Sequence, residues 1–169
     1  MKIELNVTMP AEEILRHMRA CPGFIAWVDS RTITATWEDC PCADWMLWFA
    51  AEIGIDRKLI VLAACDCART VLPVVPAGDV RPVRVIEIAE AWTRGKASLD
   101  NVEAAIAHAA YAATAAAYAA TAAAYAADAK EHTARLDHLR LMADLVRARI
   151  PATVVDERTI IWTQREDLP

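Results

Sequence analysis

Two closely spaced cysteine pairs are the first candidates for chemistry in this chain of 169 residues. Cys40 and Cys42 flank a proline, and Cys65 and Cys67 flank an aspartate. The familiar zinc knuckles have two residues between paired cysteines, and helical residues two positions apart diverge by about 200°. These spacings therefore predict no metal site. Because the chain has five cysteines, an odd number, and no secretory signal, we expect reduced thiols.

Cys40 is the cysteine whose position most favours reactivity, because a helix is predicted to begin near Pro41. The positive end of a helix lowers the pKa of a nearby thiol, which makes a thiol-based enzyme at Cys40 one hypothesis. The sequence identifies no base beside it. The glycines each stand alone at a turn, and neither Ser30 nor Ser98 lies in a nucleophile elbow. We therefore predict a protein that is not an enzyme and has no cofactor.

Tryptophan and arginine side chains are candidates for binding. Six tryptophans are many for a chain of this length, and aromatic groups commonly anchor protein interfaces. The arginines could receive an anionic ligand. The candidate partner- or ligand-binding residues are Trp37, Trp45, Trp48, Trp92, Arg69, Arg81, Arg84 and Arg94. Two further interpretations stay open, a hydrophobic core for the tryptophans and solvated helix surfaces for the arginines.

The charge pattern limits the classes of partner. The formal net charge is −5, from 23 acidic and 18 basic residues, and no basic block occurs in the chain. Nucleic acid is therefore not an expected partner. Residues 104–127 carry no formal charge, but only Ile106 among them is strongly apolar, so no membrane span is predicted. Since no secretory signal is present, we expect a cytoplasmic protein.

Most of the candidate cysteines, tryptophans and arginines are expected to lie on helices. Helical patterns bounded by Pro, Gly or Asp cover residues 9–20, 43–53, 57–72 and 83–94. Asp56 is a suitable N-cap for the third of these helices. Gly54 and Gly95 are suitable stops for the second and the fourth.

An alanine-rich repeat follows, in which the unit AAYAATA recurs from Ala109 onward. No Gly or Pro occurs in residues 99–150, which predicts a long helix. This helix is expected either to project and pair with a partner or to bend near residues 128–133, where the repeat decays. Alanine on most faces lets neighbouring helices approach closely, so we expect a thin central helix. The alternative is a homodimer that pairs through residues 111–125.

Both ends of the chain show patterns typical of β-strands. The segment RTITATW alternates threonine with apolar residues, as a half-buried strand does. Strands are expected at residues 2–7, 24–28, 31–37, 152–155 and 158–163. The predicted fold class is mainly α, a compact helical domain with the long Ala-rich helix and a small antiparallel β-sheet from the N- and C-terminal segments.

The domain organisation follows from these elements. We expect a single domain over residues 1–169. Residues 1–37 form a β-α-β-β-like start, residues 41–150 form the helical part, and residues 151–169 form a hairpin-like end.

Three motifs resemble those of a known family. They are Trp37-x-x-Cys40, Asp44-Trp45-x-x-Trp48 and Ala89-Glu90-Ala91-Trp92-x-x-Gly95. Over roughly Cys21 to Ala129, the chain resembles an alanine-rich family of bacteriophage and bacterial proteins that are described as immunity proteins. The resemblance implies a helical intracellular protein of bacterial conflict that blocks a toxin or a defence protein. This chain departs from the family in having Tyr where members often have Trp in the alanine repeat.

Three functional hypotheses result. The first is a non-catalytic binding protein that neutralises a partner in phage–bacterium conflict, with a protein toxin or a defence component as that partner. The second is a protein that sequesters a small anionic ligand, such as a nucleotide immune signal, between Trp and Arg side chains. The third is the thiol-based enzyme at Cys40.

Overall fold

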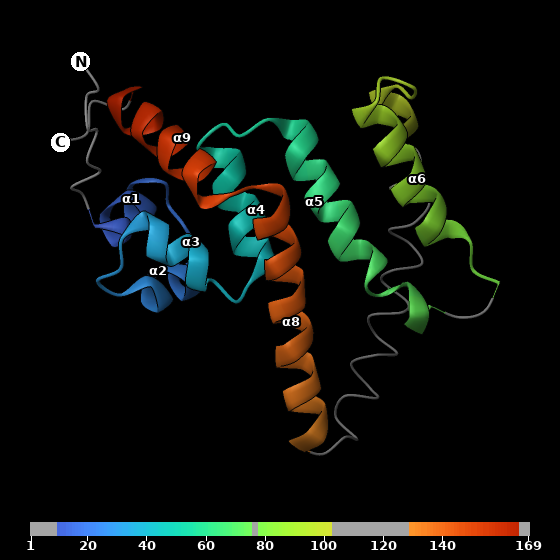
Figure 1. The fold of residues 1–169 in the computed structure, drawn as a ribbon, viewed down its shortest axis with the longest axis horizontal. Helices are drawn as coiled ribbons and strands as arrows, with labels where there is room; N and C mark the ends of the chain where they lie inside the picture. The colour runs from blue at the N-terminus through green and yellow to red at the C-terminus, as the bar shows by residue number, and fades with distance from the viewer. Residues whose placement is uncertain (1–9, 76–77, 103–128, 166–169) are drawn as a thin grey trace.

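The computed structural model of the chain describes residues 10–75, 78–102 and 129–165, and every regular element in these ranges is helical. Figure 1 shows the first, short helices grouped at the left of the view with the last helix packed beside them, and the other helices extending to the right and below. The short helices are α1 (Ala11–His17), α2 (Pro22–Val28), α3 (Ile33–Asp39) and α4 (Ala43–Glu52). The others are α5 (Arg57–Arg69), η1 (Leu72–Val74), α6 (Arg81–Thr93), α8 (Ala129–Arg149) and α9 (Ala152–Arg165).

The predicted β-sheet is wrong wherever the structure describes the chain. Residues 24–28 lie in α2, residues 33–37 lie in α3, and residues 152–155 and 158–163 both lie in α9. Asp29 and Ser30, between the two predicted strands at residues 24–28 and 31–37, link two helices instead. The predicted strand at residues 2–7 lies outside the described residues.

Segment α3 explains why the strand pattern misled. Its threonines alternate with apolar residues, yet the buried residues are Ile33, Thr36 and Trp37, which have helical spacing. Thr32 is the N-cap, and its hydroxyl accepts a hydrogen bond from the backbone N–H of Ala35 at 3.2 Å. Threonine is a common helix cap, so its presence beside apolar residues did not require a strand.

Helix α9 shows the same ambiguity at the other end of the chain. Val155 and Thr159, four residues apart, are fully buried on one face of this helix. The Thr159 hydroxyl donates to the Val155 carbonyl at 2.8 Å, which satisfies it inside the helix. The tertiary contacts of that face therefore override the strand propensity of the β-branched residues.

The helices predicted in the first part of the chain are confirmed, with shifted ends. The Asp56 carboxylate caps α5 by accepting a hydrogen bond from the Lys58 backbone N–H at 2.9 Å. Gly54 and Gly95 follow α4 and α6 with φ of +72° and +70°, the left-handed backbone that favours glycine as a helix stop. The repeat and the predicted bend lie largely outside the described residues, and α8 begins at Ala129.

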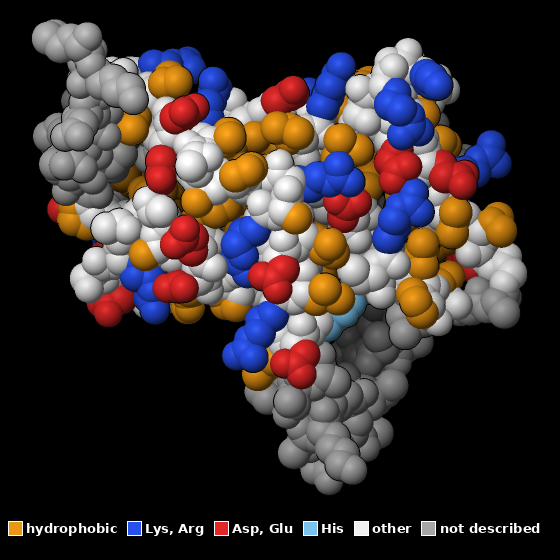
Figure 2. All heavy atoms as spheres, viewed as in Figure 1, with side chains coloured by type: hydrophobic (Ala, Val, Ile, Leu, Met, Phe, Trp, Pro, Cys, Tyr) orange, Lys and Arg blue, Asp and Glu red, His pale blue; other side chains and the backbone are white. Residues whose placement is uncertain are grey.

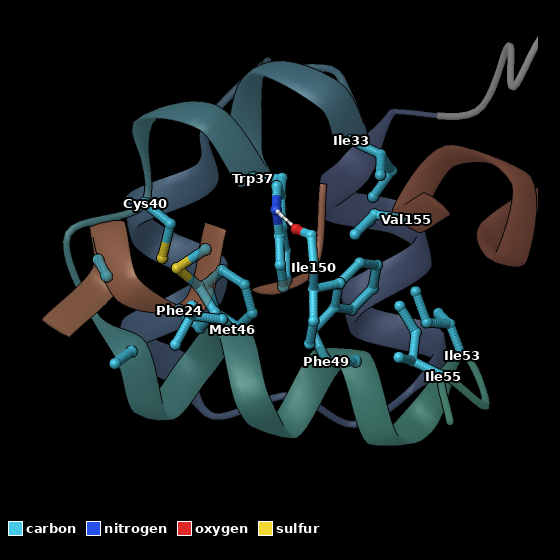
Figure 3. Packing of buried hydrophobic residues seen from close by; sticks show 14 of the residues in the cluster. Phe24, Ile33, Trp37, Cys40, Met46, Phe49, Ile53, Ile55, Ile150 and Val155 are labelled. Carbon is cyan, nitrogen blue, oxygen red and sulfur yellow. Dashed lines mark hydrogen bonds between the residues drawn. The ribbon is translucent and has the colours of Figure 1, made fainter. Parts of the chain in front are cut away.

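The described helices enclose one principal hydrophobic cluster. Helix α8 packs against α4 and α5, α9 packs against α3, and α6 packs against α5 (Figure 1). Figure 3 shows the centre of this cluster, where Trp37 lies among Met46, Phe49 and Ile150. These residues come from both ends of the described chain, so the core is formed by contacts between distant segments.

Two reciprocal hydrogen-bonding contacts join α3 to the end of α8. The buried Trp37 indole N–H donates to the Ile150 carbonyl at 3.0 Å, as the dashed line in Figure 3 shows. In return, the Arg147 guanidinium donates to the carbonyls of Trp37 at 3.1 Å and of Cys40 at 2.9 Å. Each contact satisfies carbonyls that a helix end leaves without a partner. We call this pair of contacts the Trp37–Arg147 clasp.

Two polar contacts join α9 to α3 and to the residues that follow α4. The Thr34 hydroxyl donates to the Asp156 carboxylate at 3.0 Å and 3.1 Å. The Arg158 guanidinium donates to the Gly54 carbonyl, and a Cβ atom added at Gly54 would lie 2.8 Å from Arg158 Nη2. Gly54 is therefore constrained both by its backbone conformation and by the close approach of Arg158.

Substitution of Gly54 and of Gly95 by Ala should separate the cost of the backbone conformation from the cost of the close approach of Arg158. Both residues have nearly the same φ, but a Cβ added at Gly95 has no neighbour within 4 Å. Gly95→Ala should therefore cost only the backbone strain, about 1–2 kcal/mol. Gly54→Ala should cost about 1 kcal/mol more, because it also displaces the Arg158 hydrogen bond. Urea unfolding measures the difference, and equal losses of stability would show that Arg158 does not constrain this position.

Candidate functional site

A cluster of aromatic side chains forms where α2 meets α4. It consists of Phe24, Trp27, Trp45 and Trp48, and we call it the tryptophan cluster. The rings of Phe24 and Trp45 are stacked with centroids 5.0 Å apart and an interplanar angle of 13°. Trp27 lies 6.1 Å from Trp45, and Trp48 meets Phe24 edge-on at 6.3 Å. Phe24 is buried, whereas the three indoles are only half-buried, so the cluster extends from the core to the surface.

Arg31 covers one indole of the tryptophan cluster. Its guanidinium carbon lies 4.8 Å from the Trp27 ring centroid, and its Nη1 donates to the Trp27 carbonyl at 2.9 Å. Its Nε also lies 3.8 Å from the Asp39 carboxylate. These contacts hold Trp27 in place at the surface. The Arg31 guanidinium forms a cation–π interaction with the Trp27 ring.

The structure brings two of the four candidate tryptophans together and separates the others. Trp45 and Trp48 share the tryptophan cluster. Trp37 is buried in the clasp with an exposed fraction of 2%, so it cannot contact a partner. Trp92 is half-buried on α6, outside the cluster.

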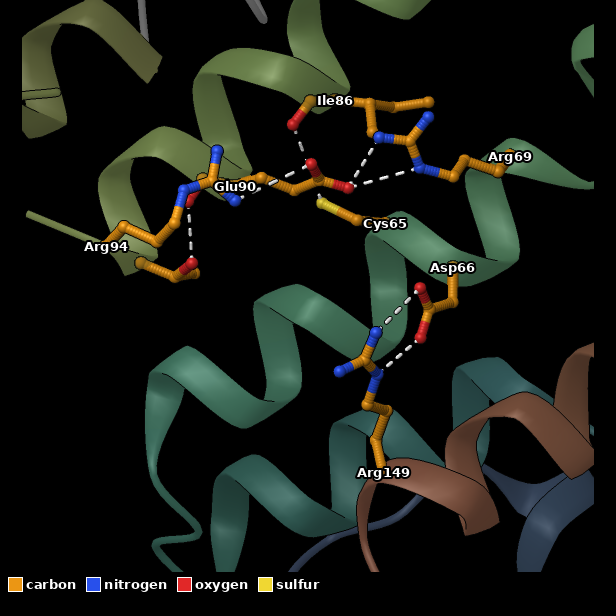
Figure 4. Close-up of polar contacts among 8 residues, drawn as sticks. Cys65, Asp66, Arg69, Ile86, Glu90, Arg94 and Arg149 are labelled. Atoms are coloured by element: carbon orange, nitrogen blue, oxygen red, sulfur yellow. Dashed lines mark hydrogen bonds and ion pairs between the residues drawn. The ribbon is translucent and has the colours of Figure 1, made fainter. Parts of the chain in front are cut away.

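The candidate arginines are mostly engaged with carboxylates. Arg69 on α5 donates to Glu90 on α6 at 2.7 Å and 3.1 Å, and Arg94 lies 3.8 Å from the other Glu90 oxygen (Figure 4). These hydrogen bonds raise the pKa of Arg69. Nearby, Arg149 of α8 binds Asp66 of α5 through two hydrogen bonds of 2.5 Å and 3.1 Å. The arrangement connects three helices through ion pairs that already neutralise most of its positive charge.

The two remaining candidate arginines lie at the start of α6. Arg81 binds Asp79 through two side-chain hydrogen bonds of 2.7 Å and 2.8 Å, which lower the pKa of that carboxyl to about 2. Arg84 is exposed and contacts no carboxylate among the described residues. The four candidate arginines therefore do not converge on one anion site.

The cysteines are buried rather than poised for reaction, apart from Cys21 at the surface and the half-buried Cys42. Burial raises the pKa of the Cys40 thiol to about 11, and it raises that of Cys67 to about 11 as well. Burial also raises the pKa of Cys65. A thiol with such a pKa holds little thiolate at neutral pH, which makes it a weak nucleophile. Cys40 instead fills space in the core beside Met46 (Figure 3).

The described residues show neither a metal-binding group nor a membrane-spanning helix. They contain no group of three or more His, Cys, Asp or Glu side chains arranged to hold a metal ion. None of their helices has both the length and the apolar character to cross a membrane.

Comparisons with protein-family models, with curated proteins and with solved structures each found no match. The resemblance to the immunity proteins stays a prediction from the sequence motifs.

Sequence analysis missed three members of this surface: Phe24, Trp27 and Arg31. The segment that holds the first two was assigned to a strand, in which residues three apart point to opposite faces. In a helix the same spacing places Phe24, Trp27 and Val28 on one side, and Phe24 and Val28 are indeed buried. The Pro-Gly pair at positions 22 and 23 could have indicated this, because proline is common in the first turn of a helix.

The buried thiols predict a loss of stability in alkali. Folded Cys40 has a pKa of about 11 against an ordinary value of 9.0, so the folded state keeps a proton that the unfolded state releases. The free energy of unfolding should therefore fall as the pH rises from about 9 to about 11. Cys40→Ala should flatten this decline, whereas Cys21→Ala, at an exposed thiol, should not. Urea unfolding at a series of pH values measures the slopes, and identical slopes in both variants would refute a buried, protonated Cys40.

Proposed function

We propose that this chain is a non-catalytic cytoplasmic protein that binds and neutralises a protein partner in phage–bacterium conflict. The observation that carries the binding part of the proposal is the tryptophan cluster, three half-buried indoles gathered from two helices. Trp and Arg are the side chains most often found at the energetic centres of protein interfaces. The conflict setting rests on the motifs that resemble the immunity proteins.

The geometry of the cluster suits a pre-formed interface. The stacked Phe24 ring and the Arg31 contact hold Trp45 and Trp27 in fixed positions, so little conformational entropy is lost when a partner covers them. A half-buried indole also has an apolar face that gains from further burial. The cluster is therefore a better binding anchor than isolated surface tryptophans would be.

The other two hypotheses have less support. An anionic ligand at Arg69 and Arg94 would have to displace Glu90, whose carboxylate both of them face. A thiol-based enzyme would have to activate Cys40, which is 1% exposed. The described contacts favour binding by aromatic side chains over both alternatives.

A binding experiment with matched tryptophan variants tests the proposal. Tagged protein is used to capture a partner from a lysate of the native host or of its infecting phage, and the captured protein is identified by mass spectrometry. Trp27→Ala should weaken binding of that purified protein by about 30-fold or more, the loss expected for an interface anchor. Trp92→Ala is the control, because Trp92 is also half-buried but lies on α6.

The neutralising role needs a second readout. Expression of the captured protein alone should impair the growth or the defence of the host cell, and co-expression of the wild-type chain should relieve the effect. Equal binding by Trp27→Ala and Trp92→Ala would contradict the proposed surface. A captured protein whose activity the chain does not change would contradict the neutralising role.

A further inference from the structure

The acidic charge of the chain is concentrated in its first helices. Residues 10–56, which form α1 to α4, carry a formal net charge of −5, equal to that of the whole chain. Their acidic residues are Glu12, Glu13, Asp29, Glu38, Asp39, Asp44, Glu52 and Asp56, and their basic residues are Arg16, Arg19 and Arg31. Figure 2 shows several Asp and Glu side chains exposed over the region of α1 to α3, with some Lys and Arg side chains among them, and a mixture of both charges over α6.

An open cleft of about 370 Å³ lies between α1 and α2 in this acidic region. Its apolar wall is formed by Pro22, Ile25 and Ala26. Its charged lining consists of Glu12 and Arg16, which pair with each other at 2.6 Å, and of Asp29. Since Arg16 neutralises Glu12, the Asp29 carboxylate supplies the uncompensated charge of the cleft.

Asp29 combines an unpaired carboxylate with an uncommon backbone conformation. Its exposed carboxylate forms no hydrogen bond or ion pair with any described residue. Its backbone has φ of 50° and ψ of −136°, a conformation that non-glycine residues rarely adopt. Glycine would adopt this conformation between α2 and α3 with less strain, so the aspartate lowers the stability of the fold at this position.

Helix α2 lies between the cleft and the tryptophan cluster. Ile25 and Ala26 of this helix line the cleft, while Phe24 and Trp27 belong to the cluster. A partner that covers α2 would therefore contact an unpaired carboxylate on one side and half-buried indoles on the other.

We propose that α2 docks a basic surface of a protein partner, with a Lys or Arg side chain of that partner in the α1–α2 cleft against Asp29. The apolar wall of Pro22, Ile25 and Ala26 holds the methylene groups of such a side chain, while its charged end meets the carboxylate. The adjoining partner surface covers Trp27 and Trp45. This proposal rests on the proposed function and specifies the chemistry of the partner.

The charge distribution favours this occupant over others. The net charge of −5 over residues 10–56 attracts a basic protein and accelerates its association, whereas it repels nucleic acid and acidic proteins. A purely apolar partner would leave Asp29 desolvated without a counter-charge, which is unfavourable.

Asp29→Gly separates function from stability. Because glycine relieves the backbone strain, this variant should melt at a higher temperature than the wild type. Because it removes the free carboxylate, it should bind a fluorescein-labelled octa-arginine peptide at least fivefold more weakly in fluorescence anisotropy at 150 mM salt. Arg19→Gly is the matched control, since Arg19 also has a positive φ, of 58°, but does not line the cleft. It should bind octa-arginine at least as tightly as the wild type.

The outcomes distinguish this proposal from the proposed function. Octa-arginine binding that is unchanged in Asp29→Gly, or matched by binding of octa-glutamate, would overturn the basic docking site. A captured partner that needs Trp27 but binds Asp29→Gly as well as the wild type would also overturn it, and would leave the neutralising function intact. Loss of octa-arginine binding in Asp29→Gly, with no partner that depends on Trp27, would support the docking site and contradict the neutralising function.

Discussion

Trp37 and Arg147 form the contact on which the rest of the structure depends, because each satisfies carbonyls at the end of the other's helix. The Trp37 indole donates to Ile150 at the end of α8, and Arg147 donates to the last turn of α3 and to Cys40. A buried indole N–H without an acceptor would cost about 1–3 kcal/mol, so this packing is available only when the two helix ends meet. The clasp therefore connects residues more than a hundred positions apart in the sequence.

The location of the candidate surface follows from that connection. Once α3 is fixed against α8 and α9, the short links before and after α3 fix α2 and α4 as well, and the tryptophan cluster lies between those two helices. The side chain that sequence analysis considered most reactive, Cys40, belongs to the core instead. The half-buried indoles of the tryptophan cluster are therefore the candidates for binding.

The sequence correctly predicted the helices that have clear boundary residues. The strand predictions were wrong, because they rested on short segments whose pattern does not distinguish a strand from a helix. Asp56, Gly54 and Gly95 marked helix ends correctly, because capping and positive φ are local properties. The terminal segments were assigned to strands because segments of four to seven residues that are rich in β-branched and aromatic side chains fit both periods. Tertiary contacts, such as those between α3 and α9, decide between the two structures. The same error concealed Trp27 and Arg31, whereas Trp45 and Trp48 lay on a correctly predicted helix.

Native-state hydrogen exchange tests most directly whether the clasp makes the two ends of the chain one cooperative unit. We predict that the slowest amides of α3 and of the second half of α8 exchange with the same free energy of opening, and that Trp37→Phe lowers both by the same amount, about 1–3 kcal/mol. Opening of α3 at a much lower free energy than α8, with α8 unaffected by Trp37→Phe, would contradict this account.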